Sequence, residues 1–208
     1  RAVRGLRDIT QTIQDITQHP VIVSMTLLAG FSSFFVGNAY NAQMPGFAQD
    51  LGHGDPGMSY SMLLAADAAG GMLAGVVLEG RGLLSAKPHT AIILAMLWSG
   101  ALAGFALASS YPIALMLLFS AGFFELSFNA MAQTLVQIHA PADMRGRVIG
   151  LFNMASLGLR AFSGVSVGLI GGLIGVHRSL ALSATVMLAI ACGMFFILAR
   201  RYKEDAGR

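Results

Sequence analysis

Charged residues are scarce in this sequence: they make up 11% of the chain, whereas a soluble domain carries about 25%. Apolar residues account for 55%, and the mean hydropathy is +0.69. A soluble fold of 208 residues with this composition would have too few charges to cover its surface. The composition therefore excludes an ordinary soluble domain and indicates an integral membrane protein.

Cysteine is almost absent, because Cys192 is the single one, and an internal disulfide is therefore excluded. No Cys/His group has the spacing of a zinc site, and the five histidines lie isolated from one another at predicted helix ends or in loops. The sequence has no glycine-rich loop of the kind that binds nucleotide phosphates. We therefore predict no metal, no cofactor and no nucleic-acid partner.

One apparent catalytic motif fails on its context. Gly164-Val-Ser166-Val-Gly168 matches the GxSxG nucleophile elbow, which requires a strand-to-helix turn. Here the motif lies inside an apolar run, where no aqueous triad can assemble around Ser166. An intramembrane enzyme thus lacks a catalytic set, and we predict that the chain is not an enzyme.

Six apolar stretches are each near the roughly 20 residues that a helix needs to cross a bilayer core. They are Val21–Tyr40, Met58–Glu79, Pro88–Ala108, Pro112–Ile138, Val148–Val176 and Leu180–Ala199. Backbone in lipid must satisfy its own hydrogen bonds, and the alternation of a barrel is absent, so helices are expected. We predict an all-α membrane protein with a six-helix transmembrane bundle over residues 21–200. Pro45 and the glycines that follow predict a loop over Asn41–Gly57.

Basic residues are unevenly placed along the chain. Of the thirteen Lys and Arg residues, eleven fall on the side of the bundle that would hold both termini, whereas Arg178 lies on the opposite side and Arg160 lies inside a helix. Loops on the cytoplasmic side carry the excess of basic residues in membrane proteins. We therefore predict a multi-pass protein of the cell (inner) membrane with both termini in the cytoplasm.

Residues 1–20 form a leader that differs from the bundle. Leu6, Ile9, Ile13 and Ile16 recur at helical spacing on an otherwise polar segment, which predicts a cytoplasmic helix lying along the membrane surface. A tether that orders only against a partner fits the pattern equally well. Residues 201–208 are predicted to form a cytoplasmic tail. Because the chain opens on Arg1 rather than Met, we expect a fragment.

Ionisable residues inside membrane helices are costly, and by default each is a functional hypothesis. Asp67, Glu125 and Arg160 are in this class. Glu125 lies thirteen residues before Ile138, and Arg160 lies fourteen after Gly146. At about 1.5 Å per residue, both lie roughly 20 Å from the same turn, so a helical hairpin would bring them together at equal depth. The pair either fixes the register of the hairpin or responds to substrate or protons, and the sequence leaves both open.

Amide side chains accompany these charges. Glu125, Asn129 and Gln133 are spaced i, i+4 and i+8, which places them in one stripe of the fourth helix. Interhelical hydrogen bonding could explain any one amide, but a stripe that contains a charge favours the wall of a wet cavity. The predicted substrate or coupling cavity consists of Glu125, Arg160, Asp67, Asn129, Asn38, Asn41, Gln133 and Asn153. The third and sixth helices carry no such residue and are predicted to face lipid.

Glycine recurs at helical spacing on two helices. Gly164, Gly168 and Gly172 repeat on the fifth helix, and Gly71 and Gly75 repeat on the second. Small residues every fourth position let helices approach closely, so both helices are expected to meet close partners.

The stretch FFELSFNAMAQTLVQIHAPADMRGRVIGLFNM, at Phe123–Met154, resembles the fourth and fifth helices in the second half of major facilitator superfamily exporters. The Arg145–Arg147 run, which follows a proline and an acidic residue, is most similar to the enterobactin-exporter-like branch. The glycine-rich segment up to Thr185 continues the resemblance. It covers essentially the whole chain, with the leader matching the link between two six-helix halves.

The cytoplasmic signature of that family, G-x-x-x-D-R-x-G-R, is only partly matched here. The corresponding turn runs from Gly75 to Gly82, with Glu79 where Asp would stand and Gly80 interposed before Arg81. Glu79 and Arg81, together with Arg145 and Arg147, are therefore the positions at which the loop motifs of the family fall. The departure puts in doubt a gating ion pair between Glu79 and Arg81.

The resemblance implies a rocker-switch carrier whose cavity lies between two halves and is lined by the first, second, fourth and fifth helices of this one. It also implies that the second and fifth helices pack on the other half. We expect proton-coupled efflux of a small organic molecule such as a siderophore or drug. The expected partners are the bilayer, the missing N-terminal half, the substrate and protons. The alternatives are a half-size carrier that works as a homodimer and a non-transporting scaffold or receptor.

Overall fold

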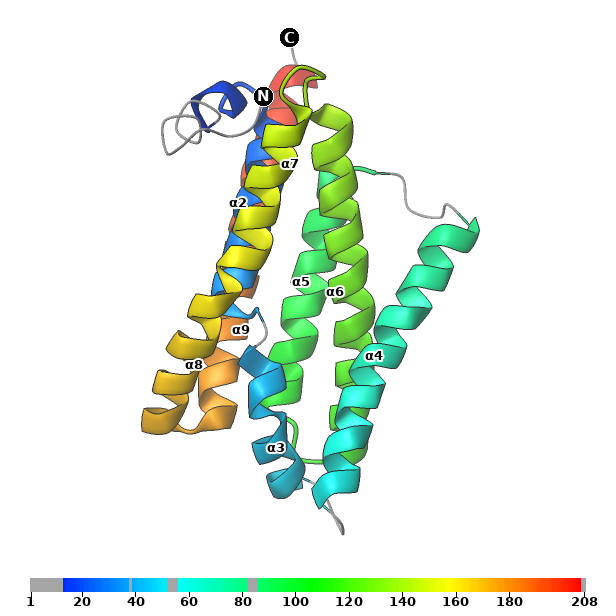
Figure 1. Ribbon diagram of the computed structural model, residues 1–208, viewed down its shortest axis with the longest axis vertical. Coiled ribbons are helices and arrows are strands. Elements are labelled where there is room, and N and C mark those ends of the chain that lie inside the picture. The colour runs from blue at the N-terminus through cyan, green and yellow to red at the C-terminus, as the bar shows by residue number, and fades with distance from the viewer. Residues whose placement is uncertain (1–12, 38, 52–55, 82–85, 207–208) are drawn as a thin grey trace.

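The computed structural model describes residues 13–37, 39–51, 56–81 and 86–206, which form a bundle of long helices (Figure 1). Its elements are α2 (Pro20–Phe35), α3 (Ala39–Leu51), α4 (Pro56–Arg81), α5 (Pro88–Ala106), α6 (Tyr111–His139), α7 (Arg145–Asn153), the π-helix η1 (Met154–Gly158), α8 (Arg160–Ile174) and α9 (Val176–Ala206). This described part contains six spans long and apolar enough to cross a membrane. The predicted fold class, an all-α protein with six transmembrane helices, is confirmed.

Helix starts follow the prolines of the sequence. Pro20, Pro88 and Pro112 each stand in the first turn of a helix, where the missing N–H costs nothing because it would have no intrahelical partner. The last helix differs from the prediction at both ends, since α9 begins at Val176 and continues to Ala206. Most of the segment predicted as a tail is therefore helical.

The predicted loop over Asn41–Gly57 is wrong, because most of it belongs to helix α3. Pro45 lies inside α3 rather than in a turn. A proline removes one backbone hydrogen bond, and membrane helices tolerate that loss when neighbouring groups compensate. The real interruption of the first span comes earlier, between Phe35 and Ala39, where α2 gives way to α3.

Helix α6 lies at the centre of the packing and contacts α2, α4, α5 and α7, while α4 packs against α6 and α3 at one edge of the bundle (Figure 1). The core between α5 and α6 includes the stacked rings of Trp98 and Phe128, with centroids 6.1 Å apart. Helix α5 has more than half of its span buried within the chain, although Ile93 and Leu97 on it are exposed. Helix α5, the third span, is thus part of the core of the bundle. Whether its exposed side faces lipid stays a prediction.

Helices α4 and α6 approach so closely that their backbones touch at two glycines. A Cβ added at Gly70 would overlap the carbonyl of Phe119, and a Cβ added at Gly122 would overlap the carbonyl of Asp67. Gly71 and Gly75 on α4 also lie close to α6, with their nearest contacts from a built Cβ at 3.8 and 3.9 Å. The predicted close packing of the second helix thus occurs inside this chain, against α6.

The two ends of the bundle differ in character. The start of α2 and the end of α9 lie at the same end, which is also where α6 turns into α7 (Figure 1). At the opposite end the ring of His177 joins three helices, with Nε2 3.1 Å from Asp50 Oδ2 on α3 and Nδ1 3.1 Å from the carbonyl oxygen of Ala106 on α5. Sequence spacing gave no sign of this contact, because Asp50 and His177 are 127 residues apart.

We predict that Gly122→Ala destabilises the protein, because the added methyl group overlaps the α4 backbone. The expected loss is about 1–3 kcal/mol, the usual cost of overpacking. Gly100→Ala on α5 is the matched control, since a Cβ there meets nothing within 4 Å, and alanine favours a helix by up to about 1 kcal/mol. Thermal melting of both variants in detergent checks the prediction. Equal melting temperatures would show that the two helices do not meet at Gly122.

Candidate functional site

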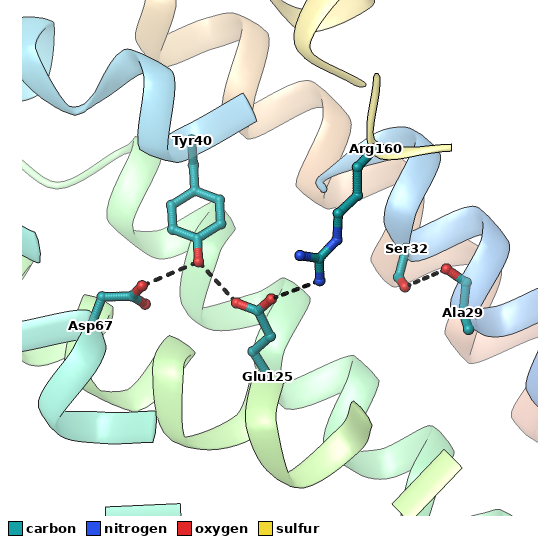
Figure 2. Close-up of polar contacts among 6 residues, drawn as sticks. All are labelled: Ala29, Ser32, Tyr40, Asp67, Glu125 and Arg160. Carbon is teal, nitrogen blue, oxygen red and sulfur yellow. Dashed lines mark hydrogen bonds and ion pairs between the residues drawn. The ribbon is translucent and has the colours of Figure 1, made fainter. Parts of the chain in front are cut away.

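Four polar side chains meet inside the helix bundle, and each comes from a different span (Figure 2). The hydroxyl oxygen of Tyr40 lies 2.8 Å from Glu125 Oε2 and 3.3 Å from Asp67 Oδ2. The other oxygen of Glu125, Oε1, lies 3.7 Å from Nη2 of Arg160. The contacts form one chain that runs from Asp67 through Tyr40 and Glu125 to Arg160, which we call the polar chain.

The polar chain opens onto a small cavity of about 270 Å³. Its lining consists of Asp67, Ala68, Gly71, Gly122, Glu125, Leu126, Asn129 and Arg160. A larger groove of about 680 Å³ lies between α4 and α6 around Met62 and Phe119, but its lining has no charged residue. Of these two cavities, only the small one is lined by ionisable side chains in the described part of the chain.

The break between α2 and α3 positions Tyr40 in the polar chain. Gly37 has φ +43°, a conformation that favours glycine, and it closes the last turn of α2 by donating to the carbonyl of Ser32 at 2.9 Å. A Cβ on Gly37 would collide with the side chain of Ser163 on α8, so glycine also allows the close packing of α8 here. The chain restarts as α3 at Ala39, and Tyr40 follows in its first turn with only 2% of its surface exposed.

The π-helix η1 positions Arg160. It spans Met154–Gly158, and Arg160 begins the next helix, α8. Helix α2 packs on η1 at Gly30, where a Cβ would lie 3.5 Å from the side chain of Leu159 and 3.6 Å from that of Ala155. π-turns inside helices are rare and are frequent at functional sites.

The polar chain thus places a guanidinium, two carboxyls and a phenol within membrane spans, in contact with one another. Such groups are retained in bilayer-spanning helices where ions, protons or polar substrates bind or pass. Within the described residues, no group of three or more metal-ligating side chains is present. This arrangement can bind a polar group or exchange a proton.

Comparison with known families identifies the kind of protein that holds this site. The Major Facilitator Superfamily model matches residues 2–164, which is most of the chain. The chain belongs to the Major Facilitator Superfamily. Searches among curated proteins and among solved structures each found no match.

Members of the Major Facilitator Superfamily are membrane transporters, and membership therefore supports a transport role for this chain. The six spans of the structure fit this family, and the polar chain draws on the first, second, fourth and fifth of them. These are the spans that the resemblance implied as the lining of the cavity. That the cavity carries substrate or protons stays a prediction.

The structure brings together four of the eight predicted cavity residues of this superfamily member. Asp67, Glu125, Asn129 and Arg160 all line the small cavity. Glu125 and Arg160 meet as their equal depth implied, because α6 and the span from α7 to α8 form an antiparallel hairpin. Asn129 lies one turn from Glu125 on the same face of α6.

The other predicted residues lie elsewhere. Asn153 ends α7 and is absent from the cavity lining, seven residues before Arg160 and separated from it by η1. Gln133 is exposed two turns beyond Glu125. Asn41 follows Tyr40 in α3 and is partly buried outside the cavity lining, whereas Asn38 lies outside the described residues.

The loop-motif residues of the superfamily lie at one end of the bundle. Arg145 begins α7 and is exposed, and Arg147 follows in the same turn, partly buried. Glu79 and Arg81 lie in the last turn of α4, but their side chains are outside the described part of the chain, as are Leu6 and Ile9 of the leader. Within the described leader, Ile13 is exposed and Ile16 is buried against the core.

Sequence reasoning missed Tyr40, which is the centre of the polar chain. Tyrosine is uncharged and common at the ends of membrane spans, so its presence near the expected end of the first helix gave no signal. The available clue was the neighbouring Gly37, which can break a helix within a span and reorient the residues that follow.

We predict that Gly37→Ala destabilises the break between α2 and α3 and moves Tyr40. The positive φ alone costs a residue with a Cβ about 1–2 kcal/mol, and the collision with Ser163 adds to it. Gly46→Ala, on α3, is the matched control, because its Cβ would meet Val176 at an ordinary 3.9 Å. Melting temperatures of the two variants check this. A variant at Gly37 as stable as the one at Gly46 would contradict it.

Proposed function

We propose that this chain is the second six-helix half of a secondary active transporter that couples proton movement to the export of a small organic molecule. The observation that carries the proposal is the polar chain, in which Glu125 contacts both Tyr40 and Arg160 within the membrane spans. The substrate class is a siderophore or drug. The Arg145–Arg147 run supports the enterobactin-exporter-like branch.

Coupling to protons follows from the surroundings of Glu125. Its side chain is 17% exposed, so a proton can reach it from the cavity, while Arg160 at 3.7 Å competes with that proton for the carboxylate. A carboxyl that is protonated in one conformation and paired with arginine in another biases the balance between the two conformations. Such a bias is what couples a proton gradient to transport.

The exposed face of α8 supports a partner half. On α8, Leu169 and Leu173 are 69% and 86% exposed, and a Cβ at Gly168 or Gly172 would meet nothing within 4 Å in the described chain. A stripe of small residues suits close helix packing in a membrane. We assign this face of α8 to the other six-helix half, with the remaining apolar surface in contact with the bilayer.

We predict that Glu125→Gln, in the protein expressed from its complete gene, abolishes proton-driven export or uncouples it from the gradient. Glutamine keeps the shape and the hydrogen-bonding capacity of glutamate but cannot take up a proton. The measurement is efflux from vesicles driven by a proton gradient, at matched protein levels. Asp15→Asn, a neutralised carboxylate at an exposed position before α2, is the control and should transport normally.

A purely structural role for Glu125 gives a different result. Glutamine would then weaken the contact with Arg160, and melting temperature and membrane abundance would fall together with transport. Gradient-driven efflux that is unchanged in Glu125→Gln would exclude Glu125 from coupling.

We also predict that the end of the bundle holding the α6–α7 turn faces the cytoplasm, as the basic residues there imply. With Cys192 replaced by serine, an impermeant thiol reagent added to intact cells should label Ser109→Cys but not Ala142→Cys. Both positions are exposed in turns at opposite ends of the bundle. Permeabilised cells, in which both should react, provide the control. The reverse labelling pattern would invert the topology.

A further inference from the structure

The Tyr40 hydroxyl lies within hydrogen-bonding distance of two carboxyl groups, yet it carries a single proton. A proton shared between two acceptors binds each of them more weakly, so the hydroxyl makes one full-strength hydrogen bond, to the nearer carboxyl. The contact with Glu125, at 2.8 Å, is the shorter of the two and has the length usual for an O–H···O hydrogen bond. The contact with Asp67, at 3.3 Å, is longer than a usual O–H···O hydrogen bond, and a proton held by Asp67 would complete it as a second hydrogen bond.

We infer that Asp67 holds this second proton, so that Asp67, Tyr40 and Glu125 form a relay that shares one transferable proton. In the conformation seen here Asp67 is a neutral acid that donates to the Tyr40 oxygen, and Tyr40 donates to the Glu125 carboxylate. Tyr40 acts through its two neighbours and is a positioning residue. The role of this relay in transport rests on the proposed function. The presence of the shared proton is inferred only from the distances between the three side chains.

The placement of Arg160 decides which carboxyl is ionised. Its guanidinium lies 3.7 Å from Glu125 Oε1, so the negative charge is stabilised on Glu125. Asp67 has no basic partner among the described residues that line the cavity, and its Oδ1 is buried there without a hydrogen-bond partner. Ionising both carboxyls would leave two negative charges against one guanidinium inside a membrane span, which is expensive.

Among the described residues that line the cavity, no other titratable side chain is present. The cavity is lined by residues of α4, α6 and α8, and its charged members are Asp67, Glu125 and Arg160, while Tyr40 reaches them from α3. Helices α5 and α9 contribute nothing to the lining. In the described part of the chain, the titratable groups at this cavity are thus the three charged side chains and the phenol.

The relay step conserves charge and protons. When Arg160 moves away from Glu125, Tyr40 passes its proton to Glu125 and receives the proton of Asp67. Tyr40 begins and ends neutral, Asp67 becomes a carboxylate and Glu125 becomes a carboxylic acid. One proton has then crossed from α4 to α6 without an ion leaving the cavity. Return of Arg160 to Glu125 reverses the step or releases the proton to the cavity.

Tyr40→Phe removes the bridge and keeps the ring, so it tests the relay directly. In the protein expressed from its complete gene, we expect net proton-driven efflux to fall roughly 10- to 100-fold, the ratio that corresponds to loss of a hydrogen bond to a charged group. Substrate exchange at equal pH, which needs no net proton transfer, should fall much less. The control is Tyr111→Phe, which removes a hydroxyl that donates to the carbonyl of Ser59 at 2.8 Å, away from any carboxyl.

Infrared spectroscopy of the purified protein locates the proton without transport. Because the inference places the proton on Asp67, the carbonyl stretch of a protonated carboxylic acid should come from Asp67. Asp67→Asn should remove that band, and Tyr40→Phe should shift its frequency because a hydrogen bond is lost. A band that survives Asp67→Asn, or that Tyr40→Phe leaves unmoved, would overturn the relay.

The two tests separate failure of the relay from failure of proton coupling. Loss of coupling in Glu125→Gln with normal net efflux in Tyr40→Phe overturns the relay alone. Equal loss of net efflux and exchange in Tyr40→Phe, with a lower melting temperature, shows a structural role for Tyr40 and also overturns it. If Glu125→Gln transports normally, coupling through Glu125 is wrong, and the infrared band decides the shared proton by itself.

Discussion

An ionised group inside a bilayer has no water around it, so the protein must supply its partners. In this chain Glu125 lies between Arg160 and Tyr40, and Tyr40 also reaches Asp67. Because these four side chains come from four spans, satisfying them fixes the relative depth and rotation of those spans. Apolar packing alone would not do so, since apolar surfaces tolerate many registers. The polar chain therefore specifies the bundle as well as the cavity.

Two glycines make the polar chain possible in different ways. Gly122 provides space, because it lets the backbone of α4 at Asp67 lie directly against α6, and Glu125 is less than one turn further along the same helix. Gly37 provides a backbone conformation, because its positive φ ends α2 and allows Tyr40 to point into the bundle from a new helix. Neither effect involves a side chain at the glycine itself.

The sequence was sufficient to predict the six spans and the meeting of Glu125 with Arg160. Both follow from local rules: the length of apolar runs, and a constant rise per residue measured from a shared turn. The role of Tyr40 was not predicted, because it depends on contacts with Asp67 and Glu125, which lie 27 and 85 residues away in the sequence. The loop predicted around Pro45 was wrong for the opposite reason. Proline locally favours a helix break, but Pro45 lies inside the continuous helix α3. Asn153 is absent from the lining of the small cavity, and η1 separates it from Arg160, so uniform helical spacing does not relate these two residues.

The π-helix makes the fifth span sensitive to length rather than to composition. One extra residue in a helical turn rotates everything that follows by about 100° relative to a regular α-helix. A chain one residue shorter within Met154–Gly158 could therefore keep its six apolar spans and every polar residue, yet turn Arg160 away from Glu125. Related sequences should accordingly be compared first by the number of residues between the α6–α7 turn and the arginine. A single deletion there changes the site more than most substitutions would.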